Sequence, residues 1–170
     1  MAVKVFWIET FSNNARLGIM ARPRGNDWLD DEIVSLKNQK VNHLISLLES
    51  TEIEELGLNQ EKYICVKNGI DFSNFPMPDR DIPNDEGKIN AFINLMSLEI
   101  EKGNSLVVHC RMGIGRSSVI AASILLQMGC YSKVTDVIDR ISIIRGLKVP
   151  DTEDQISWLR KREQRNKKKF

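Results

Sequence analysis

Short apolar runs bounded by polar or turn residues recur along this chain and are typical of β-strands. They occupy positions 3–8, 16–21, 41–48, 69–75 and 105–109. The run at 41–48 is almost continuously apolar, as expected of a strand that is buried on both faces of a parallel sheet.

Helical spacing of apolar residues fills most of the intervening segments. The clearest case is 85–102, where Ile89, Phe92, Ile93, Met96 and Ile100 form one stripe. Further helices are predicted from Asp27 or Asp30 to about 39, over 51–56, from the end of the 110–116 segment to about 128, over 132–145 and over 151–164. Over 51–56 the Thr-x-x-Glu spacing predicts a capping box of Thr51 and Glu54. Strands that alternate with helices predict one α/β domain over 1–170, with a mainly parallel central sheet flanked by helices.

The strand at 105–109 runs into a glycine-containing loop, HCRMGIGRS at 109–117, and a helix follows it. A strand, loop and helix in this order make a phosphate cradle, because backbone N–H groups and the positive end of the helix dipole converge on one anion. The two glycines permit the curl that such a loop needs. The residues expected to line the phosphate are Arg111, Met112, Gly113, Ile114, Gly115 and Arg116.

A cysteine at the start of this cradle indicates that the anion is attacked as well as held. The surrounding donors favour the thiolate of Cys110 near neutral pH, and the thiolate is the nucleophilic form. Arg116 supplies a charged planar fork for two phosphate oxygens, and the same donors can stabilise the transition state. Ser117 is placed to donate its hydroxyl to the departing sulfur, and His109 is expected to orient the loop through a backbone carbonyl.

This stretch resembles the signature of the cysteine-dependent protein tyrosine phosphatase superfamily. The likeness extends from about Val41 to Trp158 and is sharp at the loop. The small dual-specificity branch is the most similar, including the cyclin-dependent kinase inhibitor 3-like and Cdc14-like members. The resemblance implies hydrolysis of phosphate monoesters on phosphotyrosine or phosphoserine/phosphothreonine proteins, through a phosphocysteine intermediate and with no metal or other cofactor.

A second chemical feature is the turn FPMPDRDIP at 75–83, which contains three prolines and two aspartates. Cleavage of a phosphate ester needs a proton for the leaving oxygen, and an aspartate can give it and later take one from water. The superfamily carries its general acid on such a loop. In the similar branch the acid stands three residues after one proline and four before another, which selects Asp79, with Asp81 as its rival.

The segment 145–155 is similar to an Arg-Gly segment and downstream glutamine that some members bring over the active site. On that resemblance Gln155 would position the hydrolytic water and Arg145 would extend the positive rim. The residues themselves favour an ordinary helix end, with Gly146 stopping one helix, Pro150 opening the next turn and Gln155 exposed.

The composition of the chain indicates where the protein is located and whether a metal site is expected. The chain has 170 residues, 42% of them hydrophobic, which is enough for a core of its own. Its cysteines, Cys65, Cys110 and Cys130, show no paired spacing, which favours a reducing compartment and a cytoplasmic location. No secretory signal and no stretch long enough to span a membrane are evident. The two histidines lie away from any cysteine pair, so no metal site is expected and His43 is assigned to a core or edge strand.

The charge of the chain is uneven. The net charge is +1, yet segment 160–170 carries seven basic residues and one acidic residue. Such a tail can contact nucleic acid, anionic lipid or an acidic substrate. It is more often a solvated, frayed terminus, and no nucleic-acid partner is expected.

Two other classes of protein are compatible with this loop. One is a non-hydrolytic member that binds phosphorylated partners, which the presence of Cys110, Arg116, Ser117 and Asp79 disfavours. The other is an arsenate reductase or sulfurtransferase. Related reductases place the loop near the N-terminus and need a resolving cysteine nearby, and none is close in the sequence.

The loop also bears on the substrate. Arg111 is its one charged residue between Cys110 and Arg116. Phosphoinositide-directed members usually carry more basic character there, so the resemblance favours a phosphorylated protein as partner over a phosphoinositide.

Overall fold

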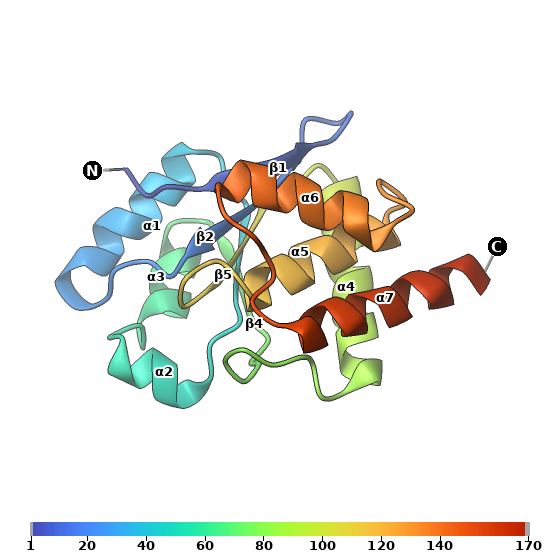
Figure 1. Cartoon of the computed structure of the whole chain (residues 1–170). Helices are drawn as coiled ribbons and strands as arrows, with labels where there is room; N and C mark the ends of the chain where they lie inside the picture. The colour runs from blue at the N-terminus through green and yellow to red at the C-terminus, as the bar shows by residue number, and fades with distance from the viewer. Residues whose placement is uncertain (1, 169–170) are drawn as a thin grey trace.

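The computed structural model describes residues 2–168, in which five strands form one sheet (Figure 1). The strand order is β1-β2-β5-β3-β4. β1 pairs antiparallel with β2, and the other neighbouring strands run parallel. The strands are β1 (Phe6–Thr10), β2 (Arg16–Ala21), β3 (His43–Ser46), β4 (Asp71–Asn74) and β5 (Leu106–Cys110). The mainly parallel, helix-flanked sheet predicted from the sequence is confirmed.

Helices cover both faces of this sheet (Figure 1). They are a 3₁₀ turn at Asn26–Trp28, α1 (Leu29–Asn38), α2 (Ser50–Glu55), α3 (Glu61–Lys67), α4 (Glu86–Glu101), α5 (Arg116–Gln127), α6 (Val134–Arg145) and α7 (Glu153–Lys168). One hydrophobic core joins the sheet to α4, α5, α6 and α7, and a second joins it to α1 and α3. None of the helices within 2–168 is both long and apolar enough to cross a membrane.

The central strand β5 shows why the apolar run at 105–109 becomes a strand. Successive side chains of a strand point to opposite faces. Leu106 and Val108 accordingly enter the core on the α5 side, whereas Val107 enters the core on the α1 side. All five residues of β5 are buried, so the strand that carries the cysteine is fixed from both faces.

The helix that follows is equally enclosed. Every residue from Arg116 to Leu126 in α5 is buried, because α5 lies between the sheet and the neighbouring helices α4, α6 and α7. A helix in this position has no solvent face, so its polar residues need internal partners. Ser123 finds one in the carbonyl oxygen of Val119, 2.8 Å away.

The sequence analysis missed the short helix α3. Its buried residues are Glu61, Ile64 and Cys65, while Tyr63 and Val66 are exposed. A seven-residue helix is marginal on its own. It forms here because it packs against α1 and β4, which no local pattern reveals.

Two predicted helix starts are wrong. α1 begins at Leu29 with Trp28 in the capping position, because the 3₁₀ turn precedes it and neither Asp27 nor Asp30 caps it. In α2 the capping box joins Glu49 and Glu52 in place of Thr51 and Glu54. The backbone N–H of Glu49 donates to the Glu52 carboxylate, with a nitrogen–oxygen distance of 3.0 Å.

The basic segment is more ordered than predicted. α7 continues to Lys168, and Arg162 on it is buried with its Nη1 2.6 Å from Asn90 Oδ1. Arg165 forms an ion pair with Glu86 at 2.7 Å. The expected frayed terminus is therefore wrong as far as residue 168, and the last two residues of the predicted tail lie outside the described residues.

The parallel strands place the chemistry at one edge of the sheet. The C-terminal ends of β3, β4 and β5 meet there, as they do at the binding edge of open α/β sheets. The segments leaving those ends are α2, the proline-rich turn at 75–83 and the loop at 110–116. Residues far apart in the sequence thereby surround one point.

Candidate active site

The loop between β5 and α5 is held in a curl by two glycines. Gly113 has φ +67°, and a Cβ atom there would lie 2.5 Å from the backbone carbon of Met20. A side chain at Gly115, which caps α5, would lie 2.7 Å from Asp151 Oδ2. A larger residue at Gly113 would collide with the Met20 backbone, and one at Gly115 would displace the Asp151 side chain.

The curl brings Cys110 and Ser117 together. The thiol sulfur of Cys110 lies 3.4 Å from the hydroxyl oxygen of Ser117, and both residues are buried. Cys110 ends β5 and Ser117 stands in the first turn of α5, so the sulfur lies at the positive end of the α5 dipole.

Arg116 is the most enclosed charged group of the site, at 1% exposure. Its Nη1 and Nη2 donate to the two Glu52 carboxylate oxygens at 2.8 and 2.9 Å, and Nη1 also donates to the carbonyl of Met77. Burial lowers the pKa of Arg116, but its hydrogen bonds to Glu52 and the charges of Cys110, Glu52 and Asp79 raise it more. Its Nε has no partner among residues 2–168.

Glu52 is a member of the site that the sequence analysis missed. Burial raises the pKa of its carboxyl group, but hydrogen bonds from Arg116 and from the Glu49 backbone lower it more, to about 2. Arg111 adds a longer contact of 3.4 Å. The sequence around Glu52 carries no signal for this role. The signal comes from the fold, because the buried guanidinium of Arg116 requires a negatively charged partner.

The two candidate acids have different surroundings. Asp79 Oδ1 lies 3.1 Å from Arg116 Nη2. The Asp81 carboxylate instead accepts from the backbone N–H of Ile82 at 2.8 Å, and its residue is exposed. The structure therefore brings Asp79 to the loop, and the side chain of Asp81 is engaged locally.

His109 lies behind the loop and is fully buried. Its Nδ1 is 3.3 Å from the carbonyl oxygen of Cys110, and its Nε2 is 2.7 Å from Glu61 Oε1. Glu61 is also buried and belongs to α3, so missing that helix concealed the partner of His109. This pair fixes the imidazole relative to the backbone that carries the cysteine.

Gln155 and Arg145 both donate to backbone carbonyls of the site. Gln155 is fully buried, and its Nε2 donates to the carbonyl of Asp81 at 3.1 Å, so the expectation of an ordinary exposed residue is wrong. Arg145 donates to the carbonyls of Gly113 and Met112 at 2.9 and 3.1 Å. Both side chains connect the segment at 145–155 to the site, Gln155 through the turn at 75–83 and Arg145 through the loop at 110–116.

Of the other loop residues, Arg111 and Met112 lie near the surface, whereas Ile114 is half-buried and packs against the core. Met112 is 59% exposed, and Arg111 donates to Glu55 Oε2 at 3.1 Å. The other cysteines, Cys65 and Cys130, form no disulfide. Burial raises the pKa of the Cys65 thiol to about 12, which keeps it unreactive.

A family model described as "Polymorphic toxin system, DSP-PTPase phosphatase" matches residues 18–130. No curated protein matches the chain in sequence.

Solved structures share the fold at low identity. Kinase associated phosphatase (KAP), crystallised with its catalytic cysteine changed to serine, has a TM-score of 0.87 at 18% identity and covers 98% of this chain and 97% of its own. PTPMT1 has a TM-score of 0.78 at 18% identity, with 98% of each chain covered. The active form of Tk-PTP has a TM-score of 0.75 at 19% identity, over 95% of this chain and 97% of its own.

The fold and the loop define a cysteine-dependent phosphatase of the small dual-specificity branch. The family model matches more than half of this chain, which shows that the chain belongs to the DSP-PTPase phosphatase family of polymorphic toxin systems.

The carboxylate of Glu52 should link stability to pH. Its pKa is lowered from 4.5 to about 2 on folding, so the stabilisation is complete above 4.5 and is lost as the pH falls toward about 2. The variant Glu52→Gln should show a shallower fall in the free energy of unfolding over that range, measured by urea unfolding at successive pH values. The matched control is Glu54→Gln, an exposed neighbour on α2, which should keep the parental slope. Equal slopes for the parent and Glu52→Gln would contradict the assignment.

Proposed function

We propose that this protein hydrolyses phosphate monoesters on phosphorylated proteins through a phosphocysteine intermediate. The proposal rests chiefly on the unpartnered Nε of Arg116. This buried donor points to a ligand, because an unsatisfied buried N–H costs free energy, and a phosphate oxygen is the partner that a guanidinium beside a phosphate cradle takes.

In the first step the Cys110 sulfur attacks phosphorus and the bond from phosphorus to the ester oxygen breaks. Backbone N–H groups of the loop and the Arg116 guanidinium hold the phosphoryl oxygens as their charge shifts. Asp79 gives its proton to the leaving oxygen. Its distance of 3.1 Å from Arg116 keeps this acid beside the phosphoryl group that Arg116 would hold.

In the second step water attacks phosphorus and the sulfur–phosphorus bond breaks. Asp79, now a carboxylate, takes a proton from the water. The Ser117 hydroxyl, 3.4 Å from the Cys110 sulfur, donates to the departing thiolate. Inorganic phosphate leaves and both residues return to their starting states.

A phosphoprotein suits the charges at the mouth of the loop. Arg111 is the loop cation between Cys110 and Arg116, and Glu55 and Glu52 already pair with it. The charge left over for an additional phosphate is therefore small. PTPMT1 has been crystallised with PI(5)P, so a phosphoinositide is the alternative substrate to compare.

The reductase alternative requires a second reactive cysteine. The raised pKa of Cys65, caused by burial, disfavours its thiolate. Cys130 is an exposed residue, but partial burial of its sulfur also raises the pKa of its thiol. The discriminating experiment is hydrolysis of para-nitrophenyl phosphate by the pure protein in the presence of EDTA. Turnover would support the phosphatase, and its absence would favour the reductase or a non-hydrolytic binding protein.

The variant Cys110→Ser should lose turnover and keep phosphate-ester binding. A serine hydroxyl without an activating base is a poor nucleophile, whereas the cradle is unchanged. Steady-state hydrolysis and equilibrium binding of a phosphopeptide measure the two properties. Cys130→Ser, a cysteine away from the loop, is the control and should retain full turnover. Substantial hydrolysis by pure Cys110→Ser would exclude Cys110 as the nucleophile.

The variant Arg116→Lys should be nearly as inactive as Arg116→Ala. A lysine carries one point charge and cannot reproduce two parallel hydrogen bonds to phosphate or to Glu52. The comparison is made on kcat/KM after circular dichroism has shown that both variants are folded. A lysine variant with a near-parental kcat/KM would show that charge alone is sufficient.

The variant Asp79→Ala should slow phenyl phosphate about 10²- to 10⁴-fold and slow an activated aryl phosphate far less. A good leaving group needs little protonation, so the acid matters less to it. Asp81→Ala is the matched control and should keep the parental ratio of the two rates. The opposite pattern, with the leaving-group effect in Asp81→Ala, would assign the acid to Asp81.

A further inference from the structure

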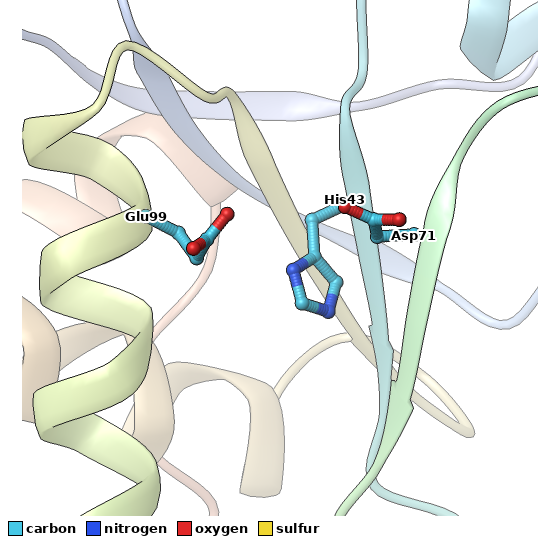
Figure 2. Close-up of side chains that lie close together, drawn as sticks. All are labelled: His43, Asp71 and Glu99. Carbon is cyan, nitrogen blue, oxygen red and sulfur yellow. The ribbon is translucent and has the colours of Figure 1, made fainter.

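A second cluster of polar side chains lies at the edge of the sheet opposite the active site. His43 and Asp71 begin β3 and β4 and are paired in the parallel register, whereas Cys110 ends β5. Glu99 reaches the same place from the last turn of α4 (Figure 2). One ligand atom from each of these three residues lies within 4.8 Å of the other two.

The imidazole of His43 is buried and incompletely partnered. The residue is 7% exposed, and its Nε2 lies 2.8 Å from Ser73 Oγ. Its Nδ1 has no hydrogen-bond partner in the part of the chain that the structure describes. Figure 2 shows this nitrogen on the ring edge that faces Glu99. With the proton on Nε2, donated to Ser73, Nδ1 presents a lone pair and accepts a ligand.

The charges around His43 favour a cation. Asp71 and Glu99 contribute two negative charges beside the imidazole of His43. Lys102 contacts Glu99 Oε1 at 2.9 Å, but its side chain is 66% exposed and can move into solvent. Asn104 donates to Glu99 Oε2 at 2.7 Å and orients the carboxylate.

We propose that His43, Asp71 and Glu99 bind a zinc ion. One imidazole nitrogen and two carboxylates are ligands that zinc accepts, with a water molecule completing the tetrahedron. Magnesium and calcium prefer oxygen ligands alone. The contact of His43 with Ser73 and that of Glu99 with Asn104 would serve as the outer hydrogen bonds that orient metal ligands. The ion would join β3, β4 and α4, and this proposal is independent of the phosphatase chemistry.

The test is a zinc titration of the Cys110→Ser variant, followed by nitrogen–proton spectra of the imidazole rings. The serine removes the active-site thiolate, because thiolates bind zinc themselves. The chain has two histidines, so the spectra contain the signals of two imidazole rings, those of His43 and His109. One equivalent of zinc should shift the Nδ1 signal of His43 and leave the His109 ring unchanged.

Ligand variants in the same background make the test specific. Asp71→Asn and Glu99→Gln should each weaken zinc binding at least about tenfold by calorimetry. Both carboxylates reach solvent, so these two variants are expected to fold like the parent. Glu101→Gln, an exposed position on the same helix, should leave the affinity unchanged. An unchanged His43 signal at about tenfold excess of zinc, or parental affinity in Glu99→Gln, would overturn the proposal and leave water as the occupant.

Discussion

A buried guanidinium holds the active site together. Arg116 is buried at the start of α5, and an enclosed positive charge without a partner is costly. Glu52 supplies the partner through two hydrogen bonds of 2.8 and 2.9 Å. The same guanidinium contacts the carbonyl of Met77 and the carboxylate of Asp79. Arg116 therefore connects the start of α5 with two other segments of the chain, α2 and the turn at 75–83.

The arrangement also explains how one residue serves both structure and chemistry. The Nη atoms of Arg116 are occupied by protein groups, whereas Nε remains without a partner among residues 2–168. The structural contacts orient the plane of the guanidinium before any substrate binds, and this preorganisation is what transition-state stabilisation requires. The loop glycines have a similar role, because Gly113 could not carry a side chain so close to the Met20 backbone.

The sequence was informative where the chemistry is contiguous. Cys110, Arg116 and Ser117 lie within eight consecutive residues of the sequence, and the proline spacing selected Asp79, which the structure places against Arg116. Glu52 and Glu61 were missed because their roles come from tertiary contacts with residues far along the chain. Glu61 was missed for a second reason as well, because the short helix α3 that carries it forms only by packing against other elements. For the same reason the pairing of His43 with Asp71 and Glu99 became visible only once three distant segments met.

The most direct test of the account is to trap the covalent intermediate. The protein is mixed rapidly with an activated aryl phosphate, quenched in acid, digested and analysed by mass spectrometry. The account predicts one phosphoryl group on the peptide that contains Cys110, present during turnover and absent in the Cys110→Ser variant. Turnover with no phosphoryl group on that peptide, or with the group on another residue, would contradict it.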